Sequence, residues 1–149
     1  MKTTNMIMIT VLVLISCSSE PLEPTNPLLL DKGIGPITTI RVIDDIDQRM
    51  ASEGLEKFNQ YCSSCHKMDK KFIGPALDGV TLRRSPEWVM NMILNPEVMV
   101  KENLIARELL MEYIAPMANQ NLTPQEARAI LEYFRQYDKT IEQKMKMEE

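Results

Sequence analysis

The stretch Cys62-Ser63-Ser64-Cys65-His66 is the most informative part of this 149-residue chain for its fold and its chemistry. Two thiols on one helical turn, followed directly by an imidazole, form the C-x-x-C-H pattern of covalent c-type haem attachment. The thiols can form thioether bonds to the two vinyl groups of haem, and the imidazole then lies beneath the iron. His66 is the only histidine in the chain. We therefore predict one haem c, held by Cys62 and Cys65 and ligated by His66.

Three other uses of a C-x-x-C pair fit this sequence less well. A thioredoxin-type redox pair lies at a strand-to-helix turn of a βαβ unit, and no such alternation of strands and helices surrounds residues 62–65. A structural zinc site needs four ligands, whereas Cys62, Cys65 and His66 supply three. A plain disulfide is the alternative that an oxidising compartment would allow. The export signal described below and the shortage of bulky core residues both favour haem.

Composition limits the chain to one small domain with extensions. Hydrophobic residues make up 44% and charged residues 26%, which excludes a disordered tail and a multispanning membrane protein. One Trp, four Tyr and three Phe are few for a core of this size, so a non-protein group is expected to fill part of it. A net charge of −4 and a pI near 5.1 argue against a surface that binds nucleic acid. No nucleic-acid partner is expected.

Residues 1–16 form a predicted lipoprotein signal peptide. Lys2 is followed by an apolar run over residues 6–15, which at about ten residues is too short for a lasting span of the bilayer. The run ends in Leu14-Ile15-Ser16-Cys17, which resembles the bacterial lipoprotein signal. The resemblance implies that Cys17 is diacylated and anchors the protein, because two acyl chains give stable membrane attachment. The alternative is an ordinary signal peptide or an uncleaved anchor with an incidental cysteine.

Residues 17–46 are predicted to contain the lipid-anchored Cys17 followed by a proline-rich tether and strap. Four prolines within residues 18–36 are expected to exclude a helix and to favour an extended linker. At roughly 3.1 Å per residue this linker could hold the domain up to about 60 Å from the membrane surface. Residues 37–43 are rich in β-branched side chains and could form one short strand. Because no partner strand is visible, we expect an extended strap that lies on the domain.

The domain proper is assigned to residues 47–142, with residues 143–149 as a charged C-terminal tail. Two helices are predicted, over about 50–61 and about 103–113. Three further helix starts share a capping side chain, a proline at the first helical position and then Glu or Gln. These starts are Ser85-Pro86-Glu87, Asn95-Pro96-Glu97 and Thr123-Pro124-Gln125. The last of them also forms a capping box with Glu126, ahead of an apolar stripe. The pattern is all-α.

Further features accompany the haem motif on both sides of it. They are Gly54, Phe58, Gly74-Pro75-Ala76-Leu77, Trp88, Pro116-Met117, Ile130 and Tyr133. Together with the motif they resemble class I c-type cytochromes, over roughly residues 50–138. The resemblance implies the all-α cytochrome c fold, with helices wrapped around one haem and with crossing N- and C-terminal helices. Gly54 and Phe58 of the first helix are then expected to lie against Ile130 and Tyr133 of the last.

Haem iron needs a second axial ligand, and with no other histidine the thioether of a methionine is the candidate. Twelve methionines leave a choice. Met68 is too close to His66 to reach the other face of the haem. Met90 and Met92 follow a helical pattern in which core packing is the default role. Met99, Met111 and Met117 remain.

Met117 is the expected sixth ligand. It follows Pro116 in a loop and precedes the cap of the last helix, which is similar to where the family places its ligand loop. Met111 is the alternative, although a methionine on a helical stripe usually belongs to the core. Ligation by His66 and Met117 raises the reduction potential and leaves no open site for a substrate, which favours electron transfer.

The resemblance also implies a set of residues around the haem. The carbonyl of Pro75 is expected to accept the second ring N–H of His66 and so to orient the imidazole. Arg83 or Arg84 is expected to bind a haem propionate through charge-assisted hydrogen bonds. The indole N–H of Trp88 is expected to bind a propionate as well. A solvated arginine and a simply buried tryptophan are the alternatives.

Basic residues are concentrated just after the haem motif in an otherwise acidic protein. The charges within residues 67–84 sum to +3. The contributing residues are Lys67, Lys70, Lys71, Arg83 and Arg84 against Asp69 and Asp78. This stretch is predicted to be the docking rim for an acidic redox partner, because complementary charge speeds encounter. The alternative is a solvated surface without a docking role.

These observations predict a one-electron carrier and not an enzyme. The expected protein is a monohaem cytochrome c, lipid-anchored to the inner or outer membrane with its domain in the periplasm. It would pass electrons from a quinol-oxidising complex or another donor to a terminal reductase or oxidase. The layout of anchor, proline tether and Gly35-Pro36 strap is similar to small lipoprotein cytochromes of nitrous-oxide reductase systems, which suggests that partner.

Two other functions are compatible with a single haem motif. One is a haem-based gas sensor or a catalytic haem, in which Met117 leaves the sixth position open. The other is a haem subunit of a larger respiratory complex, with Cys17 as its anchor. A single C-x-x-C-H argues against the two-haem bacterial peroxidases, and nothing else in the sequence marks a distal pocket.

Overall fold

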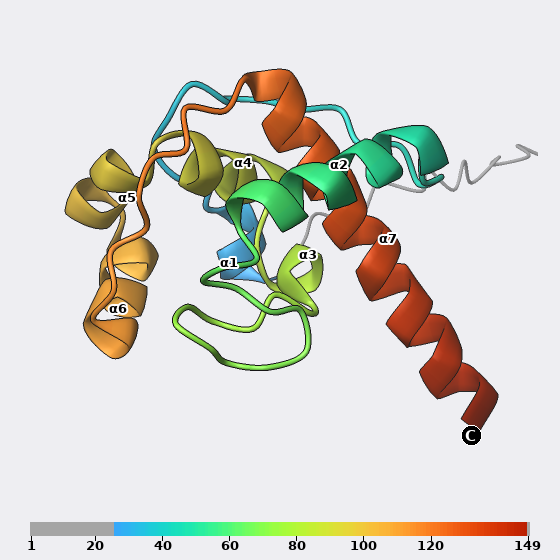
Figure 1. Cartoon of the computed structure of the whole chain (residues 1–149). Helices are drawn as coiled ribbons and strands as arrows, with labels where there is room; N and C mark the ends of the chain where they lie inside the picture. Colours follow the sequence, from blue (N-terminus) through green and yellow to red (C-terminus); the bar gives the residue numbers. More distant parts are fainter. Residues whose placement is uncertain (1–25, 149) are drawn as a thin grey trace, which may run out of the picture.

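A computed structural model of the chain describes residues 26–148 (Figure 1). Within that range the chain is helical and contains no strand, which confirms the all-α prediction. The predicted signal peptide of residues 1–16 and the predicted lipidation site Cys17 lie outside the described residues. The helices are α1 (Pro27–Leu30), α2 (Gln48–Tyr61), α3 (Val80–Arg83), α4 (Pro86–Leu94), α5 (Pro96–Glu102), α6 (Leu104–Tyr113) and α7 (Pro124–Glu148).

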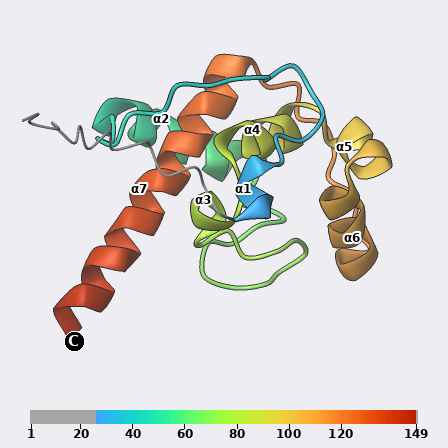
Figure 2. The same ribbon diagram turned by 180° about the vertical axis from the view of Figure 1, so that it is seen from behind.

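Helices α2 and α7 cross, as Figures 1 and 2 show from opposite sides. They touch at Gly54, where an added Cβ would lie 1.9 Å from the carbonyl oxygen of Ala129. One turn further along, the ring of Phe58 packs against Tyr133 and Phe134, with centroid separations of 5.4 and 5.9 Å. The predicted crossing of the first and last helices is therefore confirmed. Only glycine at position 54 allows the two backbones to come this close.

The three proline-marked helix starts are confirmed at the predicted residues. Ser85 caps α4 by accepting the backbone N–H of Trp88, and Thr123 and Glu126 form the capping box of α7, with the Thr123 N–H 2.9 Å from the glutamate. Asn95 does not use its side chain to cap α5, contrary to the prediction. Its amide instead donates to the carbonyl of Ile34 at 3.3 Å, because the N-terminal strap passes beside it.

The strap lies on the domain as predicted, but the linker before it is shorter than predicted. Residues 27–30 form α1, so prolines do not exclude a helix here; Pro27 occupies the first turn, where a missing N–H is harmless. From Asp31 to Asp47 the chain is extended or turned and lies against α4 and α7. The Asn91 side chain holds it through both Lys32 and Ile37. Residues 17–25 of the predicted anchor and tether lie outside the described residues.

Helix α7 continues to Glu148, so residues 143–148 of the predicted charged tail are helical and continuous with the last helix. An i,i+4 ion pair between Lys146 and Glu142, 2.7 Å apart, supports this last part of the helix. Figures 1 and 2 show it projecting away from the other helices. Among the residues that the structure describes, no helix has the length and apolar character needed to span a bilayer.

Candidate cofactor site

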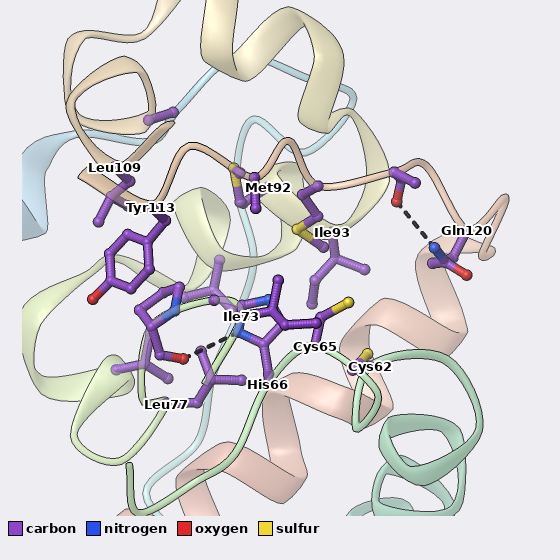
Figure 3. Close-up of a pocket in the computed structure, with 18 of the residues that line it drawn as sticks. Cys62, Cys65, His66, Ile73, Leu77, Met92, Ile93, Leu109, Tyr113 and Gln120 are labelled. Atoms are coloured by element: carbon purple, nitrogen blue, oxygen red, sulfur yellow. Dashed lines mark hydrogen bonds between the residues drawn. The ribbon is translucent and has the colours of Figure 1, made fainter. Parts of the chain in front are cut away.

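One cavity of about 380 Å³ brings the predicted site residues together (Figure 3). Its walls come from the end of α2, the loop over residues 62–77, α3, α4, α5, α6, the loop after α6 and the first half of α7. All seven predicted cofactor-binding residues line it: Cys62, Cys65, His66, Pro75, Arg83, Trp88 and Met117. The alternative ligand Met111 is not among the lining residues, and its side chain is 65% exposed on the outside of α6. This position favours Met117 over Met111 as the sixth ligand.

The C-x-x-C-H motif forms one helical turn at the end of α2. Cys62 is the C-cap of that helix, and the N–H groups of Cys65 and His66 both donate to its carbonyl, at 3.0 and 2.9 Å. The two thiols are free and point toward the cavity, so the disulfide interpretation finds no support. Burial, with a smaller contribution from Cys65, raises the pKa of Cys62 to about 11. Both sulfurs are thus placed to form thioethers to a group in the cavity.

The imidazole of His66 is oriented by its neighbours on the following loop. Its Nδ1 lies 3.1 Å from the carbonyl oxygen of Pro75, as the resemblance implied (Figure 3). With Nδ1 donating there, Nε2 is left to bind a metal. Burial lowers the pKa of His66, which favours the neutral ring that ligation requires. Gly74 lies under the ring, and an added Cβ would be 2.5 Å from Cε1 of His66.

Two methionines line the cavity. Met117 lies there in the loop between α6 and α7, which is the predicted position. Met92 of α4 lines the cavity too, and it also packs against the hydrophobic core. The interpretation of Met92 as a core residue alone is therefore incomplete. Met90 and Met99 are buried in the core at 2% and 0% exposure and do not reach the cavity.

The prediction for Trp88 is wrong in one respect. Its ring lines the cavity, but its indole N–H donates to Oδ1 of Asn103 at 3.2 Å and is not available to a propionate. No sequence pattern indicated this partner, because Asn103 lies fifteen residues further along the chain, at the start of another helix.

Both arginines of the predicted propionate site line the cavity. Arg83 donates through Nη2 to the carbonyl of Ala76 at 2.9 Å and through Nη1 to the carbonyl of Asp78. Arg84 stacks over the ring of Trp88, with its guanidinium carbon 5.2 Å from the centroid. Burial and the neighbouring Arg83 lower the pKa of Arg84. Propionate binding by Arg83 stays a prediction, since its bonds in this structure are to backbone carbonyls.

The lining of this cavity fits haem c. Apart from the motif and the two arginines, most of the wall is aliphatic or aromatic, as a porphyrin requires. Sequence reasoning missed several of these residues because they lie on ordinary apolar helix faces. They include Val80, Val89, Ile93, Ala106, Leu109, Leu110 and Tyr113. The shortage of aromatic residues in the core is thus explained, since a space is kept for a flat apolar group beside two thiols and an imidazole.

An all-α fold with crossing terminal helices, and a C-x-x-C-H turn at the wall of an apolar cavity, define the class of monohaem c-type cytochromes. The chain belongs to the cytochrome c family, whose model matches residues 51–138. It carries one covalent haem c, attached through Cys62 and Cys65. The family is one of electron-carrier haem proteins.

Solved structures agree with this assignment. Cytochrome c from Rhodothermus marinus is 39% identical, with a TM-score of 0.71 over 77% of this chain and 97% of that one. An engineered form of that cytochrome is 38% identical, with a TM-score of 0.70 over 76% and 97%. The engineered form bound to a carbene intermediate is 39% identical, with a TM-score of 0.67 over the same shares. Among curated proteins, no sequence matches this chain.

Proposed function

We propose that this protein is a one-electron carrier whose haem iron is ligated by His66 and Met117. The observation that supports it best is that one cavity holds both a neutral, oriented imidazole and a thioether from a loop. Haem c supplies a metal that cycles between ferric and ferrous states. With His66 and Met117 as its ligands, the iron would favour the ferrous state and have a raised potential, and no position would be left for a substrate.

The chain's own residues then serve to hold the ligands still. The Pro75 carbonyl fixes the ring of His66, and Gly74 lets the loop pass directly beneath it. Two thioether bonds keep the cofactor in place during repeated turnover. Little movement on oxidation or reduction is what fast electron transfer needs, and these contacts provide it.

Binding of carbon monoxide tests this function against the gas-sensor and catalytic alternatives. The ferrous protein is expected to show no change in its optical spectrum on exposure to carbon monoxide, because Met117 occupies the sixth position. Met117→Ala should bind it at once. Ready binding by the unaltered protein would contradict the proposal and favour an open haem.

A docking surface is proposed beside the haem motif, smaller than the predicted rim. Arg83 and Arg84 line the cavity, and Lys67, Lys70 and Lys71, of which Lys70 and Lys71 are exposed, form the rest of the basic stretch. These lysines flank the adjacent side chains of Phe72 and Ile73, which are 53% and 47% exposed. Ile73 also lines the cavity. An apolar patch rimmed by positive charge suits an acidic redox partner.

The docking proposal is tested by removing charge from its rim. Lys70→Ala/Lys71→Ala should slow the second-order electron transfer with an acidic partner at low ionic strength, and the difference should disappear as salt is added. Lys144→Ala/Lys146→Ala, at the far end of α7, removes the same charge away from the haem and serves as the control. Equal rates for both double variants would refute the docking surface.

We further propose that the protein is a periplasm-facing lipoprotein, anchored through Cys17 to the inner or outer membrane. The sequence before Cys17 and the reach of the chain from residue 18 to the strap support this. Its donor would be a quinol-oxidising complex or another reductant, and its acceptor a terminal reductase or oxidase, of which nitrous-oxide reductase is one candidate. Labelling with a radioactive fatty acid should mark the protein but not its Cys17→Ser variant.

A further inference from the structure

Asp31 of the strap forms hydrogen bonds with the starts of two helices that line the cavity. Its carbonyl accepts the hydroxyl of Ser85 at 2.6 Å, and its Oδ2 accepts the amide of Asn103 at 2.8 Å. Its Oδ1 accepts the N–H of Gly33 at 2.8 Å, which fixes the turn of the strap. Ser85 and Asn103 are the N-caps of α4 and α6. A single strap residue therefore joins both helices.

Trp88 connects this network to the cavity. Its backbone N–H donates to Oγ of Ser85 at 3.1 Å, and its indole N–H donates to Oδ1 of Asn103. The side chain is 4% exposed, and its ring lines the cavity. Both polar groups of Trp88 thus end on side chains that Asp31 holds.

Both polar atoms of the Asn103 side chain form hydrogen bonds. Its Oδ1 accepts from Trp88 and from the backbone N–H of Ala106, and its Nδ2 donates to Asp31. The residue is 7% exposed, so without Asp31 a nearly buried donor would be left unpaired. Because such a donor is costly, the amide would turn toward water and withdraw Oδ1 from the indole.

We propose that Asp31 is a positioning residue of the haem site, which acts through Ser85 and Asn103 to hold Trp88 against the cavity. It also fixes the start of α6, the helix that leads directly into the Met117 loop. The strap is thus a working part of the haem site, although it precedes the region that the family model matches. Loss of Asp31 loosens this wall and speeds the entry of small ligands; that last consequence rests on the proposed function.

The holoprotein contains a single tryptophan, so its indole N–H gives one resonance that reports on this contact alone. In Asp31→Ala we expect the hydrogen exchange of that indole to be about fivefold faster or more, which corresponds to the lower end of the cost of leaving a buried donor unpaired. Asp45→Ala is the matched control. It removes the same charge from the same strap at an exposed residue that makes no side-chain hydrogen bond within the described part of the chain, and its exchange should equal that of the unaltered protein.

A second variant separates charge from hydrogen bonding. Asp31→Asn loses the charge but keeps one carbonyl acceptor, so its indole exchange should lie between those of the unaltered protein and Asp31→Ala. If Asp31→Ala does not accumulate as folded holoprotein, the indole exchange of Asp31→Asn provides the test instead. Exchange rates for both Asp31 variants within about twofold of Asp45→Ala would overturn the proposal, because surface substitutions alone produce changes of that size.

Ligand entry gives an independent readout on the same proteins. Imidazole should bind the ferric Asp31→Ala holoprotein several times faster than it binds Asp45→Ala, because α6 and the loop after it are less firmly held. Equal imidazole rates would refute the effect of Asp31 on access. Absence of sulfur ligation in the unaltered protein would instead refute the Met117 assignment, and the indole exchange would still decide the role of Asp31.

Discussion

His66 depends on two backbone features of the loop that follows it. The carbonyl of Pro75 orients the ring, and the missing side chain at Gly74 gives the ring its space. The first feature followed from resemblance to class I cytochromes, and the second is visible only in the geometry. At this scale the motif, the proximal histidine and the position of Met117 in the cavity were predictable. The partner of Trp88 was not, because no sequence pattern joins it to Asn103.

Replacing Gly74 tests the fit beneath the histidine. In Gly74→Ala the new Cβ must displace the ring or the loop, since it would lie 2.5 Å from Cε1 of His66. We expect a loss of about 1–3 kcal/mol in the free energy of unfolding, which is typical of overpacking, and a shifted haem spectrum. Denaturant unfolding and the Soret band measure both. Gly35→Ala is overpacked as well, against the buried side chain of Asn91 and not against His66, so it should lower the free energy of unfolding without shifting the spectrum. Identical spectra for Gly74→Ala and the unaltered protein would contradict this description.

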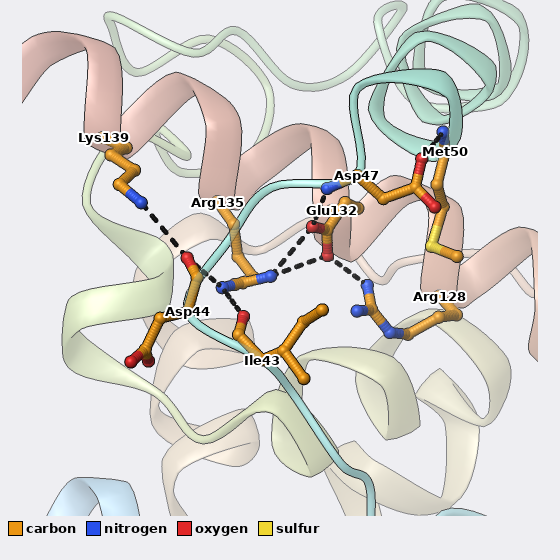
Figure 4. Close-up of polar contacts among 8 residues, drawn as sticks. All are labelled: Ile43, Asp44, Asp47, Met50, Arg128, Glu132, Arg135 and Lys139. Atoms are coloured by element: carbon orange, nitrogen blue, oxygen red, sulfur yellow. Dashed lines mark hydrogen bonds and ion pairs between the residues drawn. The ribbon is translucent and has the colours of Figure 1, made fainter.

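At the scale of elements, the strap and α7 are joined through the buried carboxylate of Glu132 (Figure 4). Glu132 is 1% exposed and accepts from Arg128, from Arg135 at 2.8 Å and from the backbone N–H of Asp47 at 2.9 Å. Arg135 continues to the carbonyl of Ile43 at 2.6 Å. The start of α2, the strap and α7 therefore share one ion cluster. The proline and capping signals predicted the helix starts well. The contacts of this ion cluster could not be predicted, because its residues follow no sequence pattern.

Removing the charge of Glu132 should destabilise the protein strongly. In Glu132→Gln two arginines keep their charge beside a neutral amide, and breaking a buried ion pair in this way costs about 3–5 kcal/mol. Denaturant unfolding monitored by circular dichroism measures the loss. Glu142→Gln breaks an exposed pair on the same helix and should have little effect. Equal stabilities for the two variants would show that the cluster does not hold these elements together.

The same cluster predicts a pH dependence. Burial alone would raise the pKa of Glu132, but the hydrogen bonds from Arg128, from the N–H of Asp47 and from Arg135 outweigh it and lower the pKa below its ordinary value of 4.5. Because the pKa of Glu132 is lower in the folded than in the unfolded state, the ionised carboxylate stabilises the protein above pH 4.5. This stabilisation is lost as the pH falls below that value. The loss of stability on acidification should be smaller in Glu132→Gln. Parallel curves for the two proteins would contradict this.

At the scale of the whole molecule, the strap makes the domain larger than its sequence boundaries indicated. The haem motif and the helix-start signals predicted the cofactor and the helices, and the resemblance to class I cytochromes implied that the first and last helices cross. The extent of α7 and the anchoring of residues 31–47 could not be predicted, because they depend on side chains such as Asn91 and Glu132 that meet the strap from distant positions. Proline content does not distinguish a free linker from a segment that is bound to a domain, because it favours an extended chain in both.

The near-infrared spectrum of the ferric holoprotein tests the central claim most directly. Sulfur bound to ferric haem gives a weak charge-transfer band there, and we predict that the unaltered protein shows it and that Met117→Ala lacks it. Met92→Leu is the matched control, because it removes the other thioether of the cavity, and it should keep the band. A band that is absent from the unaltered protein, or that survives in Met117→Ala, would contradict ligation by His66 and Met117 and with it the closed haem of an electron carrier.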